Sequence, residues 1–158
     1  MKTLPAYNEL TMTPSQWNKQ TMARFDVEIE LANYSDMILA REGIITPEKV
    51  RRCKLSGVVD SGAAELVLPE TVAKQLGVRV KKKVKVRYAD DRNAMRDKVD
   101  LVHLKMQGRD GVYDAIVEPK RRTVLIGALV LEHLDFLIDP KNERLVPRDP
   151  RYKICEIE

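Results

Sequence analysis

The sequence predicts an all-β fold, a small closed β-barrel with one or two short helices. Turn-forming residues recur roughly every eight to twelve residues, which is typical of a chain folded into many short strands. The segments between these turns are short and rich in valine, isoleucine and leucine. The chain has 158 residues, a length that suits one domain better than two.

The first half of the chain predicts three extended segments. From residue 25 to residue 31 apolar residues alternate with acidic ones, so this segment is expected to be a strand with one solvent-exposed face. Residues 33–36 predict a turn. Residues 50–59 lead as a strand into Asp60, and residues 65–68 are expected to be extended.

Two short helices are expected. Pro69 opens the first in its initial turn, where the missing N–H costs nothing, and Gly77 ends it. The second covers residues 128–134, in which two leucines have helical spacing.

The second half predicts strands joined by tight turns. The strand over residues 80–87 is lined with lysines and leads to a hairpin tip at residues 88–93. Residues 124–126 are apolar throughout, which favours a buried strand. Further strands are expected at residues 95–106, 112–117, 136–138 and 144–147.

Both chain ends are expected to lie outside the domain, which covers residues 22–150. Residues 1–21 are polar without a clear period and predict a flexible arm. Residues 151–158 predict a further strand or a tail, with a dimer interface as one place for it. No apolar run is long enough to span a bilayer, and no secretory signal is evident. Cys53 and Cys155 are therefore expected to be reduced thiols in a cytoplasmic protein.

The positive charge of the chain leaves two interpretations open. A formal net charge of +4 is by itself a poor argument for a nucleic-acid partner. The lysines of residues 81–85 suit a solvated edge strand on which charge discourages aggregation. They also suit a site for an acidic partner.

The best candidate for a reactive site is Asp60-Ser61-Gly62, at the end of a predicted strand. A strand that ends in this tripeptide places the carboxylate on a rigid element. The glycine allows close backbone approaches, and the hydroxyl can stiffen the loop through hydrogen bonds. The same residue types also form ordinary turns, so the motif needs support from elsewhere in the chain.

That support comes from three segments which, in order, resemble those of a single-domain, retropepsin-like aspartic protease. Residues 58–63 resemble its signature of two hydrophobic residues followed by Asp-Ser/Thr-Gly-Ala. Residues 84–104 lie where that family has its flap hairpin. Leu125-Ile126-Gly127, followed by a short helix, resembles the segment that packs behind the active loop. The resemblance spans about residues 23–147.

The resemblance implies an aspartic endopeptidase that needs no cofactor or metal. In such an enzyme Asp60 would be catalytic, Ser61 would hold two active loops together, and Gly62 and Ala63 would line the cleft. The flap would close over an extended peptide that binds as an added strand. The flap residues expected to contact this peptide are Ala89, Asp90, Asp91, Arg92 and Asn93.

The chemistry of this family requires two carboxylates that share a proton and hold a water molecule between them. The sequence contains one Asp-Ser/Thr-Gly and no second. The resemblance therefore implies a homodimer in which Asp60 and its symmetry mate meet on the twofold axis.

Two features depart from the family's pattern. The flap tip contains no glycine, which bears on its mobility, and it carries two acids that are expected to affect the pH optimum. Ala128 stands where viral members often have a polar residue.

Other function classes remain as alternatives. The first is a dimeric protein of the same fold that binds peptides or scaffolds a complex without efficient cleavage. A nucleic-acid-binding domain has little aromatic interleaving to support it. A serine hydrolase lacks the Gly-x-Ser-x-Gly motif around Ser61, and a zinc site lacks paired ligand spacing.

Overall fold

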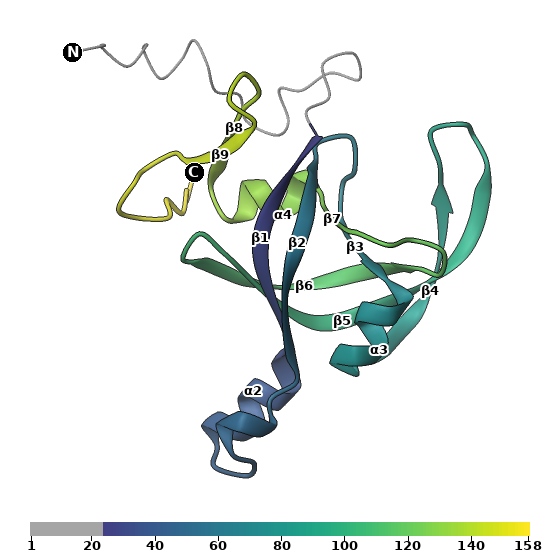
Figure 1. The fold of residues 1–158 in the computed structure, drawn as a ribbon, viewed down its shortest axis with the longest axis vertical. Coiled ribbons are helices and arrows are strands. Elements are labelled where there is room, and N and C mark those ends of the chain that lie inside the picture. The colour runs from purple at the N-terminus through teal and green to yellow at the C-terminus, as the bar shows by residue number, and fades with distance from the viewer. Residues whose placement is uncertain (1–23) are drawn as a thin grey trace.

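Six strands close into a mixed barrel in the computed structural model, which describes residues 24–158 (Figure 1). The order around the barrel is β1-β2-β7-β3-β6-β5, and β5 pairs back with β1. The β4 strand lies outside the barrel and pairs with β5 alone. The strands are β1 (Arg24–Asn33), β2 (Arg52–Asp60), β3 (Leu66–Pro69), β4 (Val80–Arg87), β5 (Asn93–Met106), β6 (Arg109–Glu118) and β7 (Val124–Ile126).

A small hairpin of β8 (Phe136–Asp139) and β9 (Arg144–Pro147) follows the barrel. The predicted all-β barrel is therefore confirmed. Three short α-helices accompany it in the described residues, one more than the upper number expected from the sequence. They are α2 (Tyr34–Arg41), α3 (Glu70–Leu76) and α4 (Ala128–His133), and a short 3-10 turn, η2, covers Pro47–Lys49.

The prediction of a turn at residues 33–36 was wrong, because β1 runs directly into α2 there. Asn33 ends the strand and caps the helix, since its side-chain oxygen accepts a hydrogen bond from the Asp36 amide at 3.1 Å. Its Nδ2 donates to the Leu76 carbonyl oxygen at 2.9 Å, at the end of α3. This second contact is distant in sequence, so the local pattern could not reveal it.

Asp36 joins α2 to the chain that returns toward β2. Its Oδ2 accepts hydrogen bonds from the Arg51 amide at 3.0 Å and from Arg51 Nε at 2.8 Å. Arg51 Nη2 donates to Oδ1 at 3.0 Å. The Arg51 hydrogen bonds lower the pKa of the Asp36 carboxyl, against the opposing effect of burial.

This ion pair predicts a pH-dependent contribution to stability. Because the folded-state pKa of Asp36 is lowered, the contribution is complete above the unfolded pKa and is lost as the pH falls through the folded value. Asp36→Asn should cost about 1 kcal/mol of unfolding free energy near neutral pH, a modest value because Arg51 is half exposed. Urea unfolding should show this difference shrinking toward about pH 2. Glu48→Gln, on the exposed η2 turn, is the matched control; a difference that does not change with pH would contradict the prediction.

The barrel core is formed by inward-facing aliphatic side chains. Val59 of β2 and Ile126 of β7 are fully buried, as are Leu68 of β3 and Leu104 of β5. All three residues of β7 are buried, which confirms the prediction for this segment. Gly77 ends α3 with a left-handed backbone (φ +63°), also as predicted.

The β4 strand is an edge strand with exposed lysines, in agreement with one of the two interpretations of its charge. Lys81 Nζ lies 3.0 Å from Asp114 Oδ2, and Lys83 Nζ lies 2.6 Å from Asp97 Oδ1. Neighbouring acids thus offset part of the charge.

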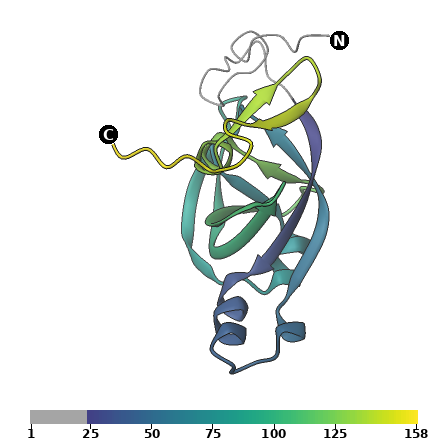
Figure 2. The ribbon, with the colours of Figure 1, turned by 90° about the vertical axis from the view of Figure 1, so that its left-hand side faces the viewer.

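Residues 151–158 form no strand in the single chain, where they are a tail, the other of the two expected forms. The tail extends away from the barrel after β9 (Figure 2). Hydrogen bonds with side chains, and not strand pairing, hold its first residues. Arg109 donates to the carbonyl oxygens of Asp149 and Tyr152, and the Ile154 amide donates to Asp135 Oδ2 at 3.0 Å.

The predicted arm at residues 1–21 lies outside the described residues. Cys53 and Cys155 are both free thiols. None of the helices between residues 24 and 158 is long and apolar enough to cross a membrane.

Candidate active site

The β2 strand carries Asp60 to one end of the barrel. Val59 points into the core and is fully buried, so the next residue faces the other side of the sheet. In the antiparallel ladder Asp60 is paired with Arg24, the first residue of β1. Directly opposite residues share a face, and Arg24 Nε accordingly lies 3.7 Å from Asp60 Oδ2. The Asp60 side chain is 14% exposed.

The residues after Asp60 form a tight loop, residues 60–64, called the active loop below. The Gly62 amide donates to Asp60 Oδ1 at 2.9 Å, and the Ala63 amide donates to the Asp60 carbonyl oxygen at 3.1 Å. These two bonds fix the carboxylate relative to its own backbone. The Ser61 hydroxyl oxygen is buried, and it has no hydrogen-bond partner among residues 24–158.

The junction of β7 and α4 braces the active loop from behind. The parallel pairing of β2 with β7 sets Val59 beside Ile126 and Val58 beside Leu125. After Gly127 the chain turns into α4, and the Ala128 amide donates to the Ala63 carbonyl oxygen at 2.9 Å. The Leu129 amide donates to the Ala64 carbonyl oxygen at 3.0 Å.

Gly127 is required by this close contact. A Cβ atom at this position would lie 2.4 Å from the Glu65 carbonyl oxygen and 2.7 Å from that of Ala64, both backbone atoms. The structure therefore brings together two segments that the sequence singled out separately, the Asp-Ser-Gly loop and Leu125-Ile126-Gly127.

Residues 48–130, which contain both segments, match a family model described as aspartyl protease. The chain belongs to the aspartyl protease family. The match covers just over half of the chain, and the closed barrel is consistent with the retropepsin-like fold of this family. Among curated proteins, none matches the chain closely enough to count as a relative.

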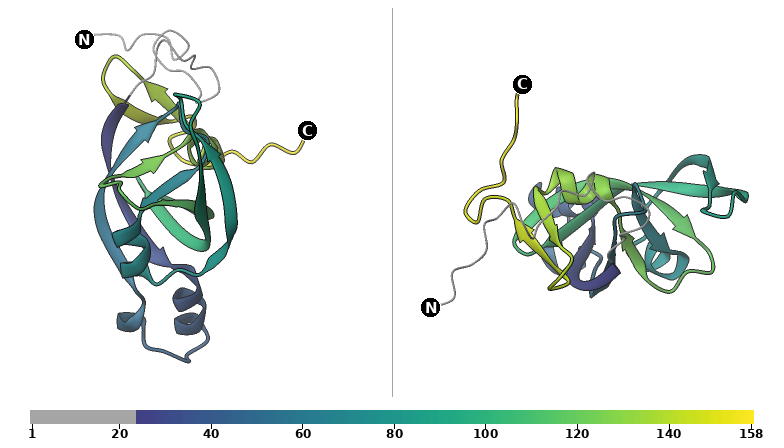
Figure 3. Two further views of the ribbon diagram at one scale, coloured as in Figure 1. Left: turned by 90° about the vertical axis from the view of Figure 1, so that its right-hand side faces the viewer. Right: turned by 90° about the horizontal axis from the view of Figure 1, so that it is seen from above.

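The hairpin predicted to be the flap is formed by β4 and β5 and extends well beyond the barrel of this aspartyl protease family member (Figures 1 and 3). Its tip holds the predicted residues Ala89, Asp90, Asp91, Arg92 and Asn93. Both acids at the tip are paired: Arg92 Nε lies 2.6 Å from Asp90 Oδ2, and Arg87 Nη2 lies 2.8 Å from Asp91 Oδ1. The Arg92 hydrogen bonds lower the pKa of the Asp90 carboxyl. Asp91 takes the left-handed conformation (φ +65°) that a glycine would adopt more easily.

A second cluster ties the base of the flap to the end of β6. The Tyr88 hydroxyl donates to Glu118 Oε1 at 2.6 Å, and Arg96 Nε donates to Glu118 Oε2 at 3.1 Å. The Arg92 guanidinium lies over the Tyr88 ring, 5.3 Å from its centroid. Burial, and then the Glu118 carboxylate, raise the pKa of the Tyr88 hydroxyl.

Sequence reasoning missed this cluster and the position of Arg24. Glu118 and Tyr88 are 30 residues apart and meet only through the strand order β4-β5-β6. The position of Arg24 could have been predicted from the sequence. The alternation of the first strand extends back by one residue to Arg24, and pairing this strand with residues 52–60 places Arg24 opposite Asp60.

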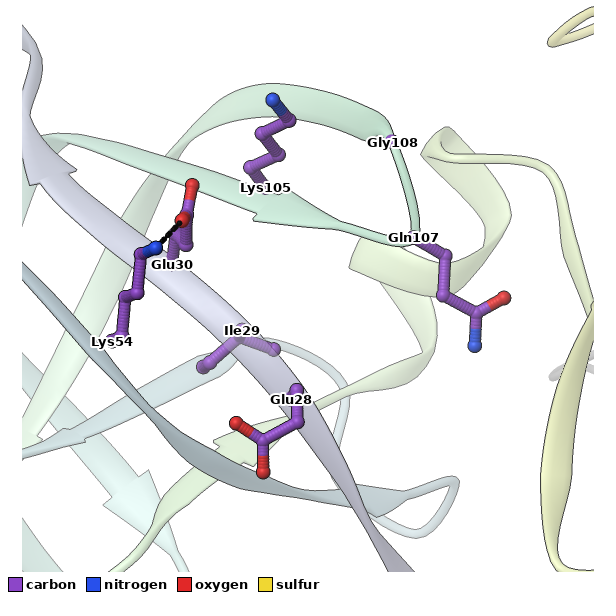
Figure 4. A pocket seen from close by; sticks show the side chains of 7 residues that line it. All are labelled: Glu28, Ile29, Glu30, Lys54, Lys105, Gln107 and Gly108. Atoms are coloured by element: carbon purple, nitrogen blue, oxygen red, sulfur yellow. Dashed lines mark ion pairs between the residues drawn. The ribbon is translucent and has the colours of Figure 1, made fainter.

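Two surface hollows lie along β1, and neither includes Asp60. One, of about 260 Å³, is bounded by Glu28, Glu30, Lys54 and Lys105, and its Glu30–Lys54 ion pair measures 3.1 Å (Figure 4). The other, of about 440 Å³, lies between β1 and the β8–β9 hairpin. These hollows are thus separate from the active loop.

Other chemistries find no support around the active loop. Between residues 24 and 158 no group of three or more His, Cys, Asp or Glu side chains could hold a metal ion. The Ser61 hydroxyl contacts no histidine that could act as its base, because it has no hydrogen-bond partner among the described residues.

Proposed function

We propose that this protein is an aspartic endopeptidase that acts as a homodimer, with Asp60 of each subunit supplying one carboxylate. The observation that carries the proposal is the position of Asp60: it sits on an active loop braced by Gly127 in a chain of the aspartyl protease family. Ser61, Gly62 and Ala63 support that loop in the proposal, and Leu125 and Ile126 back it. The domain is proposed to cover residues 22–150.

The proposed reaction uses one ionised and one protonated Asp60. The ionised carboxylate takes a proton from a water molecule as its oxygen attacks the peptide carbonyl carbon, while the other carboxyl donates its proton to the carbonyl oxygen. As the tetrahedral intermediate collapses, the first carboxyl gives the proton it took from water to the leaving nitrogen, and the second carboxylate takes back a proton from a hydroxyl of the intermediate. Two close carboxylates cannot both ionise readily, so the pair titrates as a unit. A single chain holds one such residue in a matching loop, which is why the mechanism requires two copies.

Ser61 supports the dimeric form of the proposal. A buried hydroxyl without a partner costs free energy, and such groups are uncommon in folded proteins. A second active loop packed against the first would offer the Ser61 hydroxyl a hydrogen-bond partner across the twofold axis. The isolated chain leaves this hydroxyl without a hydrogen-bond partner among the described residues.

Ser61→Ala is expected to weaken the dimer. The interface would lose one hydrogen bond per subunit, so the dissociation constant should rise about tenfold or more. Sedimentation equilibrium measures this directly. Ser35→Ala, an exposed serine on α2, should leave the constant unchanged. If both variants dimerise like the wild type, Ser61 does not act across an interface.

Concentration dependence tests the whole proposal. Peptide-library cleavage at about pH 4 to pH 7 should give a specific activity that falls on dilution in step with the dimer fraction. A monomer that still cleaves peptides would exclude the shared dyad. A stable dimer that binds peptides without cleaving them would favour the peptide-binding or scaffolding alternative.

The flap cluster leads to a prediction about substrate binding. Tyr88→Phe removes the hydroxyl that ties the flap base to Glu118 and leaves the ring under Arg92. If the flap holds the substrate, KM should rise by roughly threefold to tenfold, the value of one typical hydrogen bond, with kcat changed less. Steady-state kinetics measures the split. Tyr152→Phe, at an exposed position of the tail, is the control; a fall in kcat alone would show that the hydroxyl acts elsewhere.

A further inference from the structure

A positively charged side chain, that of Arg24, lies beside Asp60, and the proposed mechanism gives it no role. The Arg24 guanidinium lies 3.7 Å from the Asp60 carboxylate, and its side chain is 57% exposed. More than half of this side chain remains available to a molecule bound over the active loop.

A second arginine approaches from the loop between β6 and β7. Arg121 is half-buried, and its guanidinium is oriented by hydrogen bonds to Thr123: Nε donates to the carbonyl oxygen at 2.8 Å and Nη2 to Oγ1 at 3.3 Å. Burial lowers the pKa of Arg121, followed by the charge of Arg24, while the charge of Asp60 acts in the opposite direction. Arg121 thus adds a second, oriented guanidinium on the loop that leads into β7, the strand paired with β2.

The same loop carries two more cations. Lys120 and Arg122 flank Arg121, are exposed, and form no ion pair with any residue from 24 to 158. The acid nearest to this loop in sequence, Glu118, is already engaged by Tyr88 and Arg96. The loop between β6 and β7 thus carries positive charge that the described residues do not neutralise.

We propose that Arg24 and Arg121 make this protein select peptides with an aspartate or glutamate next to the scissile bond. The inference rests on the proposed peptidase function and adds a substrate class to it. A peptide bound over Asp60 places the side chains beside its scissile bond near these guanidinium groups, and arginine forms strong hydrogen bonds with carboxylates. A lysine at the same position would meet like charge instead. In a homodimer both subunits present the pair, so the preference should extend to both sides of the bond.

The preference should be local. Beyond Arg24 the same face of β1 carries the exposed acids Asp26 and Glu28. The third residue from the scissile bond lies about 7 Å further along an extended peptide than the first, where these acids and solvent oppose the effect of the arginines. Selectivity for acidic side chains should therefore fade beyond the second residue on either side.

Cleavage kinetics with matched peptides tests the inference. Starting from a cleaved library peptide, each of the two residues on either side of the scissile bond is replaced by Asp, Asn or Lys. At one position or more, kcat/KM should be at least about tenfold higher for Asp than for Lys, with Asn between them, and about 0.5 M salt should reduce the ratio. Arg24→Gln and Arg121→Gln should each lower the ratio at least about threefold. Arg41→Gln, an exposed arginine at the end of α2, should leave it unchanged.

A binding measurement distinguishes failure of the charge preference from failure of the peptidase proposal. Fluorescence anisotropy with the Asp60→Asn protein and the same labelled peptides should give tighter binding for the Asp peptide than for the Lys peptide. Equal kcat/KM for all peptides would overturn the charge preference and leave the peptidase proposal intact. Absence of cleavage would remove the peptidase proposal, and equal affinities in the binding assay would then overturn the charge preference separately. Tighter binding of acidic peptides without cleavage would support the charge preference and would mean that the protein binds peptides but does not cleave them.

Discussion

Asp60→Asn is expected to abolish peptide cleavage while leaving the homodimer intact. The asparagine oxygen can still accept the Gly62 amide hydrogen bond at the position of Oδ1, so the active loop should keep its shape. The amide cannot take a proton from water, and general base catalysis is thereby lost. The rate should fall at least about a thousandfold at every pH where the wild type is active.

Initial rates of the two proteins at equal, sedimentation-checked concentration measure this effect. Asp114→Asn is the matched control, because Asp114 is an aspartate outside the motif that pairs with Lys81 on the surface. Its activity should stay within about twofold of the wild type, as is usual for surface positions. Residual cleavage by Asp60→Asn at more than a tenth of the wild-type rate would rule Asp60 out as the base.

Subunit mixing shows whether the two carboxylates come from two chains. When wild-type and Asp60→Asn subunits exchange freely, only dimers with two wild-type chains should cleave. Activity should then fall as the square of the wild-type fraction. A linear fall would mean that each subunit works alone, and it would contradict the shared dyad even if Asp60 proved essential.

Gly127→Ala should be the most destabilising small substitution in the barrel. The added methyl group would overlap the backbone carbonyl groups of residues 64 and 65. These groups cannot retreat easily, because Ala63 and Ala64 accept hydrogen bonds from the first residues of α4. The expected loss is at least about 3 kcal/mol, above the usual cost of overpacking, since rigid backbone and not a side chain must move.

Urea unfolding measures this loss, and Gly57→Ala is the matched control within the same pair of strands. A Cβ at Gly57 would meet the terminal methyl groups of Ile126 at 2.9 Å and of Ile29 at 3.0 Å, which are the far ends of flexible side chains. Its cost should be about 1–2 kcal/mol. If Gly127→Ala unfolds at the same urea midpoint as Gly57→Ala, the backbone behind the active loop can move to accept a methyl group, and the prediction is wrong.

The parts of the site that could be predicted from the sequence are those formed by short contiguous motifs. Asp60-Ser61-Gly62 and Leu125-Ile126-Gly127 are each legible on their own, and the structure brings them together through the parallel pairing of β2 and β7. The barrel was predictable for a similar reason, because alternation and turn residues are local. Helix α2 was missed although its cap is local, because Asn33, which caps the helix through the Asp36 amide, is a residue type that also forms turns. Arg24 belongs to no motif, and its position beside Asp60 follows from the register of β1 against β2.

The separation of α2 from the active loop makes the protein easy to label without disturbing its chemistry. Figure 1 shows α2 at one end of the β1–β2 ribbon and the loop after β2 at the other, and the length of β2 sets them roughly 25 Å apart. Glu48, on the exposed η2 turn that follows α2, is accessible to a label. A fluorophore or an affinity tag inserted there would report on dimerisation and substrate capture from a distance, and surface immobilisation through it would leave the Asp60 end of the barrel facing the solution.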